Sequence, residues 1–187
     1  NIPIILITGG SQGAQKINDN AINIIGDLVK NYHVIHISGK NNYDDVKSRV
    51  SVILEGSSYR YRYHVYPYLN VIEMKMAYGA ADLIIARAGS GSIFEIAASG
   101  LPSILIPLNN AAQDHQRENA YEYARIGAAD VIEETNLTPH LLFSEIQRLI
   151  ENKEKLKKMG EFAFNFAKPN AAEKIAREII NLALEHA

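Results

Sequence analysis

The glycine-rich segment Gly9 to Gly13, with the sequence GGSQG, is the first place in the chain where residue types and spacing could do chemistry. An apolar run precedes it and apolar residues recur after it at helical spacing, which predicts a strand, a loop and a helix. Backbone N–H groups of such a loop, together with the N-terminus of the following helix, can bind a phosphate, and the Ser11 hydroxyl can add a hydrogen bond. The simpler interpretation is a tight turn with no ligand.

Other glycine-based motifs fit this segment less well. The dinucleotide fingerprint needs G-x-G-x-x-G spacing and an acidic residue after the second strand, where this chain has Ser38, Gly39 and Lys40. The pattern G-x-x-x-x-G-K-[ST] does not occur. The segment does match the G-x-S-x-G nucleophile elbow, so an α/β hydrolase that uses Ser11 is an alternative, although no earlier strand in this sequence supplies the loop that completes an oxyanion hole.

A second loop of small residues, Arg87 to Ser92 (RAGSGS), follows another predicted strand. Two phosphate-type loops at the same edge of one sheet suit a diphosphate. Glu95 follows Ser92 by three residues, and two interpretations of this carboxylate are open. It can complete a capping box with Ser92, or it can accept hydrogen bonds from two ribose hydroxyls.

A third polar segment, Asn109 to Asn119, lies between an apolar run and a helical pattern. Its amide and imidazole side chains, among them His115, Gln116 and Asn119, offer the paired donors and acceptors that a neutral sugar needs. The alternative interpretation is a polar loop in which Asp114 caps the next helix.

These three loops are expected at one edge of a doubly wound parallel sheet, because short apolar strands alternate with helical patterns. The predicted strands are 3–8, 33–38, 61–66, 83–86, 103–107 and 130–133, and the predicted helices are 14–30, 44–53, 72–81, 92–99 and 114–126. A helical tail is expected at about 138–186. The predicted fold class is α/β and Rossmann-like with about six strands, and ligands are expected beyond the carboxyl ends of the strands.

Composition narrows the classes of protein that fit the sequence. The 187 residues are 47% hydrophobic and 21% charged, which is typical of a globular domain, and the net charge of −2 gives no support for a nucleic-acid partner. The alternating Tyr and Arg residues at 59–63 could form an aromatic and a basic face that stacks on bases, but a packed strand is the simpler interpretation. The absence of cysteine excludes disulfides and thiolate zinc sites, and the lack of a membrane-span or signal-peptide pattern predicts a cytoplasmic protein.

No metal or cofactor is expected from the residue patterns. His33 and His36 are three residues apart on a predicted strand, so they point to opposite faces and make a poor metal pair. The sequence has no D-x-D pair to hold a cation at a diphosphate. The negative charge of a bound diphosphate would instead be neutralised by Arg87, backbone N–H groups and helix N-termini.

Three segments together, GGSQGA, AYGAADLIIARAGSGSIFEIAASGLPSILIP and DHQRENA, resemble the C-terminal half of the MurG family. These bacterial glycosyltransferases of peptidoglycan synthesis transfer N-acetylglucosamine from UDP-N-acetylglucosamine to lipid I, which gives lipid II. The resemblance covers about residues 5–133 and implies a GT-B fold, in which two Rossmann-like domains face each other across a cleft. It implies that residues 1–187 are the donor-binding domain, with a strand–helix core at about 3–135, and that the N-terminal acceptor domain is absent from this chain.

The resemblance also implies roles for single residues. Ser11, Gln12, Gly13, Ser90, Gly91 and Ser92 would surround the diphosphate, and Arg87 would lie near the phosphates. Glu95 would bind the ribose hydroxyls, while His115 and Gln116, with Asn119 nearby, would bind the sugar. The backbone near Leu69 and Val71 would bind uracil, although this segment is longer here than in the family.

The missing half determines what the resemblance implies about activity. An inverting, metal-independent hexosyltransferase is expected, with its general base in the absent N-terminal domain, so this chain alone is expected to be inactive. That domain would bind lipid I and place the full-length protein at the inner face of the cytoplasmic membrane. A stand-alone UDP-sugar-binding subunit of a split glycosyltransferase is the alternative.

Overall fold

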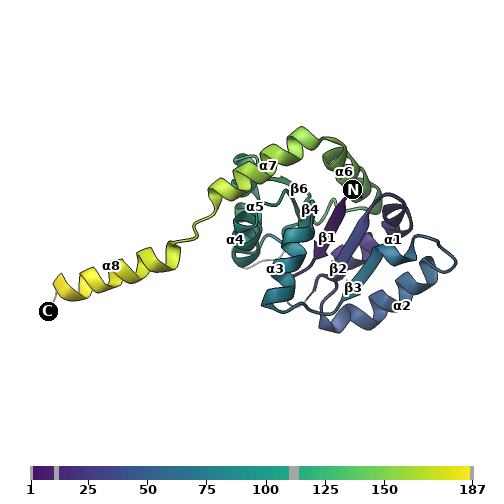
Figure 1. Cartoon of the computed structure of the whole chain (residues 1–187), viewed down its shortest axis with the longest axis horizontal. Helices are drawn as coiled ribbons and strands as arrows, with labels where there is room; N and C mark the ends of the chain where they lie inside the picture. Colours follow the sequence, from purple (N-terminus) through teal and green to yellow (C-terminus); the bar gives the residue numbers. More distant parts are fainter. Residues whose placement is uncertain (1, 11–12, 110–113, 186–187) are drawn as a thin grey trace.

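The fold is built on one parallel β-sheet, in a computed structural model that describes residues 2–10, 13–109 and 114–185 (Figure 1). Its strands are β1 (Ile4–Thr8), β2 (His33–Ile37), β3 (Tyr63–Tyr66), β4 (Leu83–Ala86), β5 (Ser103–Leu105) and β6 (Ala129–Val131). Neighbouring strands pair in parallel, and their spatial order is β3-β2-β1-β4-β5-β6. This order confirms the predicted Rossmann-like, doubly wound sheet.

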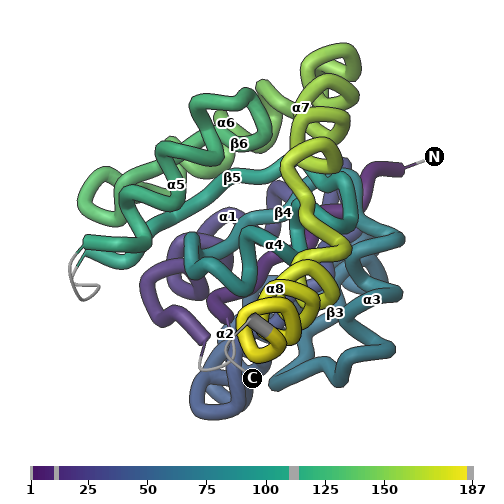
Figure 2. Tube along the Cα trace, turned by 90° about the vertical axis from the view of Figure 1, so that its left-hand side faces the viewer, coloured from purple at the N-terminus to yellow at the C-terminus, as the bar shows by residue number. Residues whose placement is uncertain are grey.

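Helices cover both faces of the sheet (Figures 1 and 2). They are α1 (Gln15–Asn31), α2 (Tyr43–Ile53), α3 (Val71–Ala80), α4 (Ser90–Ala98), α5 (His115–Arg125), α6 (Pro139–Glu151), α7 (Lys153–Phe166) and α8 (Ala171–Glu185), with single 3₁₀ turns at Lys40–Asn42 and Arg60–Arg62. Buried residues of α1, α2 and α6 share one hydrophobic core, and those of α3, α4 and α5 share the other. The sheet is therefore the middle of three layers.

The strands are apolar on both sides because both faces are covered. In β1, Ile5 and Ile7 join the core formed with α1, while Leu6 joins the core formed with α3 and α4. All three side chains have no exposed surface. This alternation fixes which side chains of the strand face each layer of helices.

Chain order reverses between β1 and β4. Ile5 of β1 is paired with Val34 of β2 on one side and with Leu83 of β4 on the other. At such a switch point the loops beyond the two carboxyl ends diverge to opposite faces of the sheet and leave a crevice between them. The loops after β1 and β4 therefore flank the place where a ligand is expected.

The third strand is shorter than predicted. It begins at Tyr63, because the preceding residues form the 3₁₀ turn Arg60–Arg62. The Arg62 guanidinium lies over the rings of Tyr59 and Tyr61, 4.9 and 5.5 Å from their centroids, and donates hydrogen bonds to carbonyl oxygens near the end of α1. The interpretation of separate aromatic and basic strand faces is therefore wrong for this segment.

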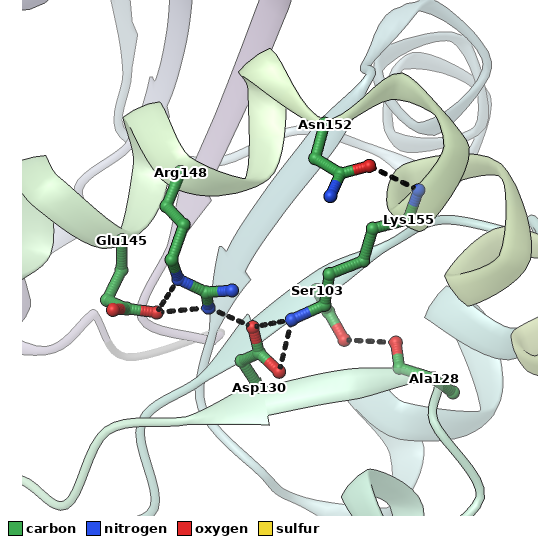
Figure 3. Close-up of polar contacts among 7 residues, drawn as sticks. All are labelled: Ser103, Ala128, Asp130, Glu145, Arg148, Asn152 and Lys155. Carbon is green, nitrogen blue, oxygen red and sulfur yellow. Dashed lines mark hydrogen bonds and ion pairs between the residues drawn. The ribbon is translucent and has the colours of Figure 1, made fainter.

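The first two helices of the predicted tail belong to the sheet's packing. Leu142 and Ile146 of α6 are fully buried in the core that contains α1. Asp130 of β6 forms ion pairs with Arg148 of α6 and Lys155 of α7 (Figure 3). Burial opposes ionisation of Asp130, but the hydrogen bonds from Lys155 and Arg148 prevail and hold the pKa of the carboxyl below its ordinary value.

The last helix, α8, projects away from this body (Figure 1). Its apolar side chains Ile175, Ile179 and Leu184 are 61%, 61% and 71% exposed. Within residues 2–10, 13–109 and 114–185, no helix has both the length and the apolar character that a membrane span requires.

Candidate functional site

A cavity of about 660 Å³ lies at the carboxyl ends of the strands, beside the switch point. One part of its wall comes from Thr8 and Gly10, at the end of β1, and another from the segment that follows β3. The predicted site residues in its lining are Leu69, Val71, Gly91, Ser92 and Glu95. The structure thus brings together the residues expected at the base, the ribose and part of the diphosphate.

Gly10 and Gly13, the described glycines on either side of residues 11 and 12, are joined by a backbone hydrogen bond, and Gly13 packs against the residue after β2. The Gly10 N–H donates to Thr8 Oγ1 at 3.2 Å, and the Gly13 N–H donates to the Gly10 carbonyl oxygen at 3.0 Å. Gly13 has a φ of 78°, and a Cβ added there would lie 2.2 Å from the carbonyl oxygen of Ser38. Glycine is required at this position by both the backbone conformation and the close approach.

Two helix N-termini follow the loops after β1 and β4. Helix α1 begins after Ala14 and α4 begins after Gly89, and neither residue caps its helix with a side chain. Backbone N–H groups of both first turns can therefore face an anion, which the positive end of each helix dipole favours. The predicted ligands Ser11 and Gln12 lie outside the described residues.

Glu95 is not part of a capping box. Helix α4 begins at Ser90, so Ser92 is already inside the first turn rather than at the N-cap. The Glu95 Oε2 atom instead accepts a hydrogen bond from the Tyr78 hydroxyl at 2.9 Å. Burial, assisted by this hydrogen bond, raises the pKa of Tyr78. The tyrosine therefore stays a donor and orients the carboxylate at the cavity wall, a partnership that the sequence did not predict.

Arg87 is held by protein groups at the end of β4. Its guanidinium forms an ion pair with Glu134, and it donates a hydrogen bond to the Ile106 carbonyl oxygen at 3.2 Å. The side chains of Arg87 and Glu134 are each 12% exposed. The resemblance implied a position near the phosphates, whereas here the guanidinium joins the segments that follow β4, β5 and β6.

Two amide side chains of the third polar segment join neighbouring loops. Gln116 Oε1 accepts a hydrogen bond from the Leu108 N–H at 3.1 Å, and Asn119 Nδ2 donates to the Ala88 carbonyl oxygen at 3.5 Å. These contacts tie α5 to the loops after β5 and β4. Both residues are outside the described lining of the cavity.

The start of α5 differs from the capping interpretation. Asp114 occupies the N-cap position with a φ of 56°, but its side chain makes no capping hydrogen bond. Its carboxylate instead lies 3.7 Å from an Arg117 guanidinium nitrogen. His115, the first residue of α5, is exposed.

The segment expected to face uracil is shaped by a capping box that the sequence analysis missed. Asn70 Oδ1 accepts hydrogen bonds from the N–H groups of Ile72 and Glu73, and the Glu73 carboxylate accepts from the Asn70 N–H at 2.8 Å. The N-x-x-E spacing before a helical pattern could have revealed it. The box fixes the backbone between Leu69 and Val71 at the cavity wall.

A metal site does not emerge from the described part of the chain. Within it, no group of three or more His, Asp or Glu side chains is arranged to hold a metal ion.

The cavity lining does include one cationic side chain, that of Lys75.

Comparison with a family model gives a match over most of the chain. The glycosyltransferase family 28 C-terminal domain matches residues 4–175. A solved structure also agrees in fold: the crystal structure of Acinetobacter baumannii MurG superposes with a TM-score of 0.83 at 29% identity, covering 97% of this chain and 52% of that chain.

Curated relatives share one name, UDP-N-acetylglucosamine--N-acetylmuramyl-(pentapeptide) pyrophosphoryl-undecaprenol N-acetylglucosamine transferase. The protein of Natranaerobius thermophilus is 35% identical over 184 residues, which are 97% of this chain and 49% of that protein. The protein of Thermoanaerobacter sp. is 38% identical over 177 residues, which are 95% of this chain and 48% of that protein. The chain spans about half the length of the curated relatives it matches.

Proposed function

Because the chain belongs to the glycosyltransferase family 28 C-terminal domain family, we propose that it is the donor-binding domain of an N-acetylglucosaminyltransferase and binds UDP-N-acetylglucosamine. The donor and the undecaprenol-linked acceptor are those in the name of its curated relatives. The same membership contradicts the alternative of an α/β hydrolase that uses Ser11.

The observation that carries this proposal is a cavity lined by the uncapped N-terminus of α4, by the carboxylate of Glu95 and by Gly10, which precedes the uncapped N-terminus of α1. The starts of α1 and α4 offer N–H groups that suit a diphosphate without a metal ion. Glu95, oriented by Tyr78, offers an acceptor that suits ribose hydroxyls. A nucleoside diphosphate needs both kinds of group, because it carries anionic phosphates and ribose hydroxyls.

The remaining assignments concern the other parts of the donor, some at the cavity lining and some outside it. We assign uracil to the backbone near Leu69 and Val71, which line the cavity. We assign the diphosphate to Gly91 and Ser92 of the same lining and to Gly13 and Ser90, together with Ser11 and Gln12, which lie outside the described residues. We assign the N-acetylglucosamine hydroxyls to the side of α5 that carries His115, Gln116 and Asn119. Arg87 would support this arrangement through its contacts with Glu134 and Ile106.

The acceptor half of the reaction is assigned to the part of the relatives that this chain does not cover. We propose that this part binds lipid I, supplies the general base and associates with the inner face of the cytoplasmic membrane, in a longer protein or as a separate subunit. The 187-residue chain would then transfer no sugar by itself, and lipid II formation by the purified chain would contradict this assignment.

UDP is expected to bind the 187-residue chain in preference to ADP, and the affinity should be the same in EDTA. The reason is that the site holds the diphosphate with N–H groups and helix dipoles rather than with a cation. Calorimetric titrations with UDP, TDP and ADP, with and without EDTA, measure this. Equal affinity for all three nucleotides, or a strict requirement for magnesium, would contradict the proposal.

Glu95→Gln is expected to weaken UDP binding by at least about tenfold, equivalent to about 1.4 kcal/mol. The amide keeps one acceptor oxygen but replaces the other by a donor, so one ribose hydroxyl loses its partner. The melting temperature should hardly change, because the remaining oxygen can still accept from Tyr78.

The matched control is Glu122→Gln, which changes an exposed carboxylate paired with Arg125 and should leave UDP affinity unchanged. Thermal melts of both free variants accompany the UDP titrations. If Glu95→Gln lowers the melting temperature while UDP affinity is preserved, the carboxylate serves only its contact with Tyr78.

A further inference from the structure

A chain of hydrogen bonds, partly buried at β3 and buried beyond it, leads from β3 through β2 to α1 and ends next to Gly13. The Tyr63 hydroxyl lies 2.8 Å from His36 Nδ1, and His36 Nε2 lies 3.0 Å from Asn18 Oδ1. Asn18 Nδ2 donates to the carbonyl oxygen of Ser38 at 3.0 Å. The network therefore joins β3, an edge strand of the sheet, to α1, the helix that follows the glycine loop.

Donors and acceptors determine the protonation of this network. Because Asn18 Nδ2 donates to Ser38, Asn18 Oδ1 accepts, and the proton of the imidazole is on His36 Nε2. His36 Nδ1 then accepts from the Tyr63 hydroxyl. Burial lowers the pKa of His36 to about 4 and raises that of Tyr63, so both groups are neutral near pH 7.

The Ser38 carbonyl oxygen is the point where this network meets the glycine loop. It also accepts a hydrogen bond from Asn42 Nδ2 at 3.2 Å. Gly13 approaches it so closely that a Cβ would lie 2.2 Å away. A displaced Ser38 carbonyl would therefore displace Gly13 and the turn into α1.

We propose that Asn18, His36 and Tyr63 are positioning residues that hold Gly13 and the start of α1 in the arrangement that binds the donor diphosphate. The inference rests on the proposed function. None of the three belongs to the described lining of the cavity, so they act through Ser38 and Gly13. Asn18 and His36 are 0% and 1% exposed. Hydrogen bonds between buried groups are directional, so they specify one arrangement of α1 against β2 more strictly than apolar packing does.

The test compares UDP with uridine, because uridine lacks the phosphates that the loop is proposed to bind. His36→Leu removes both hydrogen bonds of the imidazole and should weaken UDP binding about tenfold, while uridine affinity changes by less than about twofold. His36→Gln, whose amide can still donate to Asn18, should keep UDP affinity within about threefold of the parent. Ligand titrations of the 187-residue chain followed by NMR, below each variant's melting temperature, provide the affinities.

Tyr63→Phe is the milder variant, since it keeps the ring and leaves His36 in place. It should lower the ratio of UDP to uridine affinity about threefold. The control Tyr59→Phe, which removes a hydroxyl from an exposed ring, should leave this ratio unchanged.

If UDP and uridine affinities fall together, or if only the melting temperature falls, the network is merely structural and the proposal is overturned. If His36→Leu does not fold, an unchanged ratio in Tyr63→Phe overturns it. If the parent chain binds neither ligand, the proposed donor function fails instead.

Discussion

Replacing Arg87 by alanine is expected to lower the free energy of unfolding by about 3–5 kcal/mol. Its partner Glu134 is only 12% exposed, so truncation would leave a poorly hydrated carboxylate without a counter-charge. The Ile106 carbonyl oxygen would also lose the hydrogen bond that it accepts at 3.2 Å. Chemical denaturation of the variant beside the parent chain measures the change.

Two further variants test whether burial of the ion pair causes the large loss of stability expected for Arg87→Ala. The exposed pair of Arg125 with Glu122 has side chains 72% and 65% exposed, so Arg125→Ala should cost well under about 1 kcal/mol. Arg87→Met combined with Glu134→Met removes both buried charges and should recover most of the lost stability. A loss for Arg87→Ala that is no larger than for Arg125→Ala would contradict the expectation.

The double variant also separates two possible roles of Arg87 in binding. If its side chain acts only by holding the segment after β4, Arg87→Met with Glu134→Met should bind UDP within about threefold of the parent. A loss of about tenfold or more in a stable double variant would mean that the guanidinium leaves Glu134 to reach the phosphates, as the family resemblance implied.

The elements that carry the site could be predicted because local patterns decide them. The buried run Leu83–Ala86 has the bounds predicted from its apolar residues, and the loop after it leads into a helix as expected. The third strand was predicted too long because Tyr and Arg residues alternate from Tyr59 onward, as they would in a strand, although residues 60–62 form a 3₁₀ turn. The Arg62 guanidinium lies over two tyrosine rings and donates a hydrogen bond to a carbonyl oxygen at the end of α1. The alternation of residue types along a strand does not indicate such contacts.

The partners of the site residues could not be predicted because they are distant in sequence. Glu134 is 47 residues from Arg87, and Tyr78 is 17 residues from Glu95. Helical spacing places Tyr78 on α3, but it does not indicate that the hydroxyl meets a carboxylate on α4. Such pairs depend on how helices are set against the sheet, which the sequence pattern of a single element does not contain.

The two helix starts beside the cavity show the limits of short motifs. Ser92 and Glu95 have capping-box spacing, yet α4 begins two residues before Ser92, at Ser90, so the motif is inside the helix. Asn70 and Glu73 have the equivalent spacing and do form a capping box. The difference is set by where the preceding strand ends and how its loop is held, which is a tertiary property.

Gly13→Ala is expected to lower the free energy of unfolding by about 2–5 kcal/mol and to weaken UDP binding by more than about tenfold. Two costs combine at this position. The φ of 78° is unfavourable for a residue with a Cβ, and the new methyl group would lie 2.2 Å from the Ser38 carbonyl oxygen and 2.8 Å from Asn42 Nδ2. Because both atoms are held by hydrogen bonds, residue 13 must move rather than its neighbours.

Gly56→Ala isolates the backbone cost, since Gly56 has a φ of 72° but no atom within 4 Å of the added Cβ. It should cost only about 1–2 kcal/mol and leave UDP affinity unchanged, because the turn after α2 is away from the cavity. Denaturant melts and UDP titrations of both variants give the comparison. If the two alanines are equally destabilising and Gly13→Ala binds UDP like the parent, the Ser38 contact does not set the loop, and the diphosphate is held by something other than the turn into α1.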